Sequence, residues 1–207
     1  MASLCGGVFD VTVAPTLVAR GILPRPNHAP DPDELATWRD IVLLPDLQVC
    51  FRRPLWIDLG GIAKGYAVDR AIDAAMAYAP AQVCANAGGD LRIAGPETEN
   101  VRLADEICDP DAVPVIELTS GSLASSCGRI ASRHEPLAGP YVDARDGRHM
   151  LPRQFVSVAA PRCVGADALT KVVMALGACS ASILAASSAQ AIVHDAQFGW
   201  RTIREDA

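Results

Sequence analysis

The feature that most constrains this chain is a pair of glycines between a short apolar run and a helically spaced segment. Residues 55–59 predict a strand, Gly60 and Gly61 predict a sharp turn, and the apolar spacing over residues 62–79 predicts a helix. Glycines let the backbone approach a phosphate closely, and the amide groups that open a helix attract anions. Lys64 adds a positive charge in the first turn. The segment therefore suits a phosphate group, although a plain strand-to-helix turn gives the same pattern.

Lysine is scarce in this chain, which makes the two that occur worth examining. The sequence holds 16 arginines but only two lysines, Lys64 and Lys171, and its formal net charge is −6. An acidic chain without a block of basic residues is not typical of a dedicated nucleic-acid binder. We therefore expect no nucleic-acid partner.

The cysteines and the apolar stretches limit the other classes of protein. Seven scattered cysteines without a C-x-x-C pair indicate reduced thiols rather than a disulfide framework or a zinc cluster. The first residues lack the basic and apolar regions of a signal peptide, so the chain as written is expected in the cytoplasm. The uncharged residues 172–193 are too weakly hydrophobic for a convincing membrane span. They are interpreted as a buried helix, a turn and a strand, and no transmembrane segment is expected.

The pattern along the chain predicts one α+β domain over residues 1–207, with a mainly antiparallel sheet and packed helices. The proline-rich residues 24–33 predict a surface loop. Helices are expected at 33–38, 62–79 and 165–176, and strands at 40–44, 47–53, 55–59, 81–85, 91–94, 100–105, 113–119, 154–160, 191–194 and 201–203.

Two further segments carry polar residues at points where chemistry is plausible. Residues 86–90 hold an asparagine, two glycines and an aspartate between two strands, which by itself predicts a tight hairpin. The expected helix over residues 165–176 carries Asp167 in its first turn, either as a charge that complements the helix dipole or as a ligand for Mg²⁺. Asp167 and Lys171 are four residues apart, so a helix brings both to one face.

These segments together resemble the ApbE family, the FAD:protein FMN transferases. The motifs that carry the resemblance occur in the family's order at residues 9–15, 58–69, 86–95 and 166–170, with weaker echoes at 123–126 and 141–143. The second of these motifs is long and specific, and the resemblance runs from about residue 6 to the C-terminus. It implies an ApbE-like, T-fold-like architecture.

The resemblance also implies an activity and a set of site residues. Family members bind FAD with Mg²⁺, cleave its pyrophosphate and pass FMN to a Ser or Thr hydroxyl of a target flavoprotein, releasing AMP. By position, the residues expected to bind FAD are Val8, Phe9, Asp10, Asp58, Lys64 and Tyr141. Gly61 is expected to offer its backbone carbonyl to the metal, and Asp167 its carboxylate. No catalytic residue is assigned.

The chain departs from the family pattern in three places. The sequence as given lacks the segment that family members carry before the first motif, which predicts a fragment, a wrongly started reading frame or a reduced homologue. Family members are often periplasmic or anchored as lipoproteins. Lys171 stands where the family has threonine, and Pro140 and Ala144 replace a histidine and a proline. His134 and His149 are interpreted as exposed loop residues rather than replacements. Two alternatives to the transferase therefore remain, a non-catalytic FAD-binding protein and an FAD pyrophosphatase.

Overall fold

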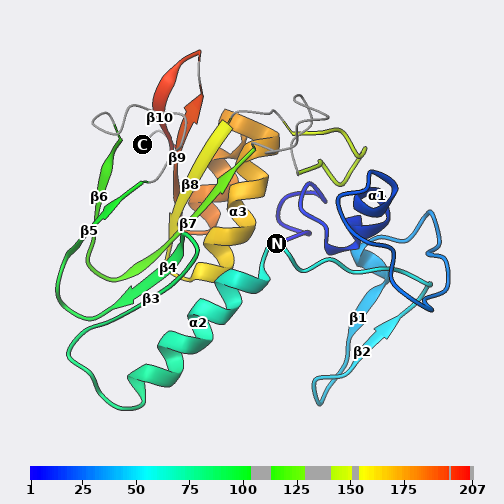
Figure 1. Cartoon of the computed structure of the whole chain (residues 1–207), viewed down its shortest axis with the longest axis horizontal. Coiled ribbons are helices and arrows are strands. Elements are labelled where there is room, and N and C mark those ends of the chain that lie inside the picture. The colour runs from blue at the N-terminus through cyan, green and yellow to red at the C-terminus, as the bar shows by residue number, and fades with distance from the viewer. Residues whose placement is uncertain (104–112, 129–140, 151–153, 196, 206–207) are drawn as a thin grey trace.

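Six antiparallel strands form the central sheet of the computed structural model, which describes residues 1–103, 113–128, 141–150, 154–195 and 197–205 (Figure 1). In spatial order they are β10 (Gly199–Ile203), β9 (Gln190–Asp195), β8 (Gln154–Ala160), β7 (Gly121–Cys127), β4 (Asp90–Ala94) and β3 (Val83–Ala87). Two small antiparallel pairs accompany it, β1 (Ile41–Leu43) with β2 (Val49–Phe51), and β5 (Glu99–Arg102) with β6 (Val115–Leu118). The expectation of an α+β fold with mainly antiparallel sheet is confirmed.

Alternating side chains of the sheet supply two separate cores, as the period of two along a strand requires. On β8, Val156 and Val158 belong to the larger core, which they share with Leu169 of the helix behind the sheet. Phe155 points to the opposite face and packs with Leu123 beneath the β5–β6 pair. Both faces of the sheet are therefore covered, which is why β8 is buried almost throughout.

Two helices, α2 (Ala63–Met76) and α3 (Cys163–Leu176), pack against each other and against the sheet (Figure 1). A buried carboxylate joins them. Asp69 of α2 accepts hydrogen bonds from the backbone amides of Cys163 and Val164, at 3.1 and 3.0 Å, and so satisfies two of the unpaired donors that open α3. Arg92 of β4 lies 3.2 Å from the same carboxylate. Asp69 thus fixes the end of α3 relative to α2 and the sheet.

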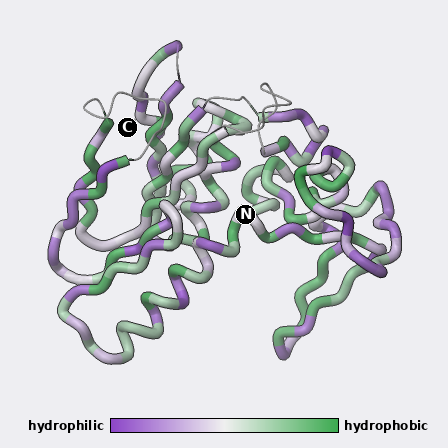
Figure 2. The backbone as a smooth tube through the Cα atoms, in the orientation of Figure 1, coloured by the Kyte–Doolittle hydropathy of each residue, from purple (hydrophilic) through white to green (hydrophobic). Residues whose placement is uncertain are grey.

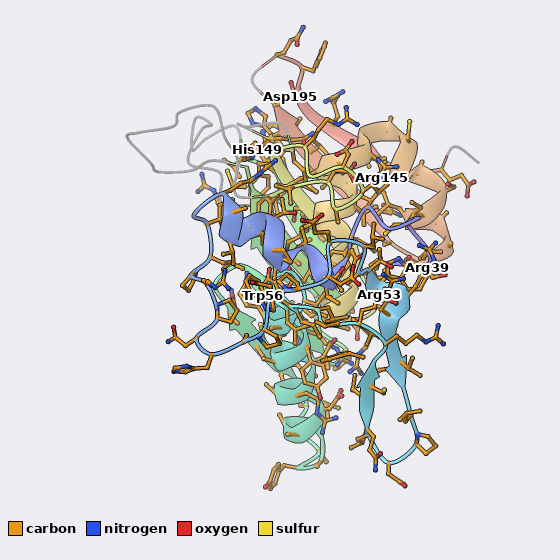
Figure 3. The ribbon with its side chains drawn as sticks, turned by 90° about the vertical axis from the view of Figure 1, so that its right-hand side faces the viewer. Arg39, Arg53, Trp56, Arg145, His149 and Asp195 are labelled. Atoms are coloured by element: carbon orange, nitrogen blue, oxygen red, sulfur yellow. The ribbon has the colours of Figure 1, made fainter. Side chains whose placement is uncertain are left out.

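The N-terminal part forms a separate cluster of short elements beside the sheet. It contains η1 (Val11–Val13), α1 (Ala14–Ala19) and η2 (Trp38–Asp40), and the β1–β2 hairpin projects from it (Figure 1). Figure 3 looks onto this side, where Arg53 lies 3.1 Å from Asp33, and Trp56 donates a hydrogen bond to the carbonyl of Pro30 at 2.9 Å. These contacts attach the predicted proline-rich loop to the rest of the domain.

The β1–β2 hairpin carries large apolar side chains although it is exposed to solvent. Leu43 and Leu47 on this hairpin are largely exposed, and the hydropathy colouring marks the arm as mainly hydrophobic with a polar tip (Figure 2). The predicted hairpin at this position is confirmed, but its side chains take no part in the buried cores.

Several boundaries differ from the sequence predictions. Residues 55–59 form no strand; Asp58 donates its amide to the carbonyl of Val11 at 2.8 Å, so this segment follows η1 rather than a sheet edge. The helix expected at 33–38 does not form; the short η2 begins only at Trp38, where Thr37 caps it through a capping box with Asp40.

Other helices differ in where they start or stop, or were not predicted. The helix α2 stops at Met76, and α3 begins two residues earlier than expected, which moves Asp167 from the first turn to the second. The short helices α1 and α4 (Ala181–Ala186) were not expected from the sequence pattern.

The segment that contains α3 is unusually apolar. By length and composition alone, Cys163–Ala186 is long and apolar enough to cross a membrane. It comprises α3, η4 (Gly177–Ser180) and α4, and half of its most apolar window is buried inside the structure. Because α3 also buries Asp167 and Lys171 against the sheet, we interpret it as a core helix.

Candidate functional site

A cavity of about 230 Å³ lies between the N-terminal segment and the first residues leading into α2. Its walls come from parts of the chain that are far apart in sequence. Of the residues predicted to bind FAD or metal, those that line it are Val8, Phe9, Asp10, Asp58, Gly61 and Tyr141. Lys171 also lines the cavity, and apolar residues of and after α1, including Leu17 and Ile22, complete the wall. The structure therefore brings most of the predicted site together.

Asp10 is held in place by the short helix that it begins. Its carboxylate accepts hydrogen bonds from the amide and the hydroxyl of Thr12, at 2.9 and 2.8 Å, and from the amide of Trp38 at 3.2 Å. The first two bonds make Asp10 the N-cap of η1, a position that favours aspartate. The third ties the N-terminal segment to η2, so both carboxylate oxygens of Asp10, which lines the cavity, are held by protein donors.

The glycine turn before α2 forms the cavity's opposite side. The amide of Gly60 donates to Asp58 at 3.0 Å, which closes the turn on itself. A Cβ atom on Gly61 would lie 2.9 Å from the ring of Phe9 and 3.6 Å from Cε of Lys171. Only glycine lets the turn approach the phenylalanine ring this closely, which gives the predicted Gly61 a steric role.

Asp167 and Lys171 form a buried ion pair on one face of α3, as their spacing indicated. The Lys171 ammonium contacts Asp167 Oδ1 and also donates to the Asp167 backbone carbonyl at 3.1 Å. Asp167 Oδ2 accepts from the amide of Gly65 at 3.2 Å. Asp167 is fully buried, and each of its two carboxylate oxygens accepts a hydrogen bond from a protein donor.

The other lysine, Lys64, pairs with Asp90, for which the sequence pattern predicted only a place in a hairpin. Lys64 Nζ lies 2.8 Å from Oδ2 of the fully buried Asp90, which begins β4, and Lys64 is not among the residues that line the cavity. Burial is the largest effect and lowers the pKa of Lys64, but the hydrogen bond and charge of Asp90, together with the charge of Asp167, raise the pKa overall. Burial raises the pKa of Asp90, although Lys64 opposes this effect. The role of Lys64 in binding FAD stays a prediction.

Tyr141 lies above the ion pair on α3. The Lys171 ammonium is 5.7 Å from the centre of its ring, within reach of a cation–π interaction. Burial raises the pKa of the Tyr141 hydroxyl, which therefore stays protonated at neutral pH. His149, interpreted as an exposed loop residue, is exposed as expected. The other such histidine, His134, lies outside the described residues, and so does Pro140, which replaces the family's histidine.

The Mg²⁺ that the family resemblance implies does not fit the residues as they are arranged. Mg²⁺ requires about six oxygen ligands in near-octahedral geometry. Both Asp167 oxygens already accept hydrogen bonds, one of them from the positively charged Lys171. Within the described ranges no three His, Cys, Asp or Glu side chains cluster in a way that could hold a metal ion. As arranged, Asp167 has no carboxylate oxygen free for Mg²⁺, and the metal roles of Gly61 and Asp167 stay predictions.

Comparisons with known proteins agree with the fold and with the family resemblance. The model of the ApbE family matches residues 1–193. An FAD:protein FMN transferase from Vibrio cholerae is 28% identical over 194 residues, covering 84% of this chain and 57% of that protein. The chain thus spans little more than half the length of this relative.

Solved structures show the same fold. An ApbE protein from Thermotoga maritima superposes with a TM-score of 0.78 at 24% identity, covering 99% of this chain and 72% of that one. The ApbE flavinyl transferase of Pseudomonas stutzeri has a TM-score of 0.74 at 19% identity, covering 100% and 72%. Because the family model matches residues 1–193, which is most of this chain, the chain belongs to the ApbE family.

Proposed function

We propose that this chain binds FAD in the cavity beside α2 and α3 and transfers its FMN part to a Ser or Thr hydroxyl of a target flavoprotein, releasing AMP. The observation that carries the proposal is the convergence of Val8, Phe9, Asp10, Asp58 and Tyr141 on one cavity. These residues come from three separate motifs of the family pattern, and nothing local in the chain requires them to meet. The name of the Vibrio cholerae relative supports the same activity.

The size of the cavity indicates how much of FAD it would enclose. Pockets that bury most of a drug-sized ligand measure roughly 300–1,000 Å³. At about 230 Å³ this cavity is smaller, so it holds one end of FAD while the remainder extends over the neighbouring surface. Its apolar wall, including Val8 and Leu17, suits a planar ring, and Asp10, Asp58 and Lys171 supply polar groups around it.

The chemistry asks the protein mainly to position groups and to neutralise charge. In the transfer, the acceptor hydroxyl oxygen forms a bond to the phosphorus of the FMN half, the P–O bond to AMP breaks, and the hydroxyl proton leaves to a base. Such phosphoryl transfers depend on orientation and on positive charge near the phosphate oxygens. Lys171 supplies such a charge at the cavity wall. Magnesium enters no step here, because the residues around Asp167 do not fit it.

Mass spectrometry of an acceptor protein separates the three candidate functions. The chain is incubated with FAD and a candidate flavoprotein, and the masses of the acceptor and of the small products are measured. A mass gain of one FMN on the acceptor, together with free AMP, supports transfer. Free FMN and AMP without an acceptor indicate a pyrophosphatase, and bound but intact FAD indicates a non-catalytic binder. A matched acceptor with its Ser or Thr replaced by alanine controls for non-covalent FMN.

A further inference from the structure

Both lysines of the chain lie in one small cluster with two buried aspartates. Lys64 contacts Asp90, and Lys171 contacts Asp167. The two pairs lie close enough for Asp167 to act electrostatically on Lys64, and for Lys171 to act on Asp90. Both aspartates are fully buried, and the side chain of Lys171 is only 9% exposed. Each buried aspartate is thus paired with one lysine, Asp167 with the buried Lys171 and Asp90 with Lys64, whose side chain is half exposed. A buried carboxylate is stable only when it is paired in this way.

The ammonium of Lys171 occupies the position that a divalent cation bound to Asp167 would need. It contacts Asp167 Oδ1 directly, while the Gly65 amide takes Oδ2. A cation of charge +2 at this point would meet a like charge at contact distance. It would also have to displace both protein donors from Asp167. Both carboxylate oxygens of Asp167 are thus satisfied without a metal.

The same ammonium has a donor left for a ligand. A lysine ammonium carries three N–H groups. Among the described residues, two of them have acceptors on Asp167, namely Oδ1 and the backbone carbonyl. Lys171 lines the cavity, beside Gly61 and beneath the ring of Tyr141. Its third N–H is therefore available to a phosphate oxygen of a molecule in the cavity.

We propose that Lys171 serves as a built-in cation at this site, holding Asp167 and neutralising the phosphate of the bound nucleotide in place of Mg²⁺. The part of this inference that concerns the nucleotide rests on the proposed function. The part that concerns the metal does not, because the pairing of Asp167 with Lys171 is a property of the protein alone.

The first test uses Mg²⁺ alone and needs no nucleotide. Mg²⁺ is titrated calorimetrically into the wild-type chain, Lys171→Thr and the charge-keeping control Lys171→Arg, after circular dichroism has shown that each is folded. Removal of the ammonium frees an oxygen of Asp167 and adds a hydroxyl, so Lys171→Thr is expected to bind Mg²⁺. The wild type and Lys171→Arg are expected to bind none. Binding to the wild type as tight as to Lys171→Thr, or binding to neither, would overturn the proposal.

The second test uses the wild-type chain and stays informative if Lys171→Thr does not fold. FAD affinity is measured by flavin fluorescence in excess EDTA and in millimolar Mg²⁺. The two affinities are expected to agree, whereas Lys171→Thr is expected to bind FAD about ten-fold more weakly in EDTA, the scale of one charge-assisted hydrogen bond, and to recover in Mg²⁺. A wild-type affinity that rises about ten-fold or more with Mg²⁺ would contradict the proposal. Failure to bind FAD in either buffer would refute the proposed function, while the Mg²⁺ titration would still decide the role of Lys171.

Discussion

Gly65 lies where the first turn of α2 meets the start of α3, and its replacement by alanine tests how tightly these helices must approach. A Cβ atom at this position would lie 2.4 Å from the carbonyl oxygen of Cys163 and 2.9 Å from Cβ of Asp167. Atoms at rest in a protein interior are about 3.5–4.0 Å apart, so the helices would have to separate by about 1 Å. The nearer obstacle is backbone, which no change of side-chain rotamer can relieve.

The size of the effect follows from two opposing contributions. Overpacking costs about 1–3 kcal/mol, and a contact of 2.4 Å with backbone belongs to the upper part of that range, about 2–3 kcal/mol; the better helix propensity of alanine returns about 1 kcal/mol. We therefore expect Gly65→Ala to lower the free energy of unfolding by about 1–2 kcal/mol. The shift also moves the Gly65 amide away from Asp167, so FAD affinity should fall as well.

Gly165 provides a matched control within the partner helix. A Cβ atom there meets nothing within 4 Å, so Gly165→Ala should raise the free energy of unfolding by about 0.5–1 kcal/mol through helix propensity alone. Urea denaturation followed by circular dichroism measures both variants. Equal stability of the two variants, or a Gly65→Ala protein as stable as the wild type, would refute the inferred close approach.

Three further changes test other parts of the structure. Asp69→Asn should lower the free energy of unfolding by about 3 kcal/mol, because it removes the buried charge that pairs with Arg92 and one acceptor at the start of α3. Urea denaturation measures this change, and a loss below about 1 kcal/mol would argue against the bridging role of Asp69. Lys64→Ala should weaken FAD binding in fluorescence titrations, whereas Arg70→Ala, which removes an exposed charge from the same helix, should not; equal affinities would count against Lys64. Hydrogen bonds from the neighbouring arginine lower the pKa of Asp143 below its usual 3.8, so its stabilising effect is complete above that pH and is lost as the pH falls through the lowered value. Asp143→Asn should therefore be less stable than the wild type at neutral pH, and the gap should narrow in urea denaturation below about pH 3.8; a gap independent of pH would exclude this linkage.

Local sequence patterns determined the elements on which the site is built. The apolar spacing over residues 62–79 predicted α2, and the glycines at 88 and 89 predicted the turn between β3 and β4, because backbone geometry follows from residues that are close in sequence. The pairing of Asp167 with Lys171 was also predictable, since a helix places residues four apart on one face. The order of the motifs pointed to the family in the same local way.

Contacts between distant segments were decided only by the tertiary structure. Nothing near Asp69 indicates that it caps a helix beginning 94 residues later, and nothing near Lys64 identifies Asp90 as its partner. The prediction of a strand at 55–59 was wrong for a similar reason, because this segment lies beside η1 and not at the edge of a sheet. Side-chain periodicity determines which face of an element is buried, but the packing of whole elements determines what that face meets. The cavity exists because Val8 and Lys171 come together from opposite ends of the chain.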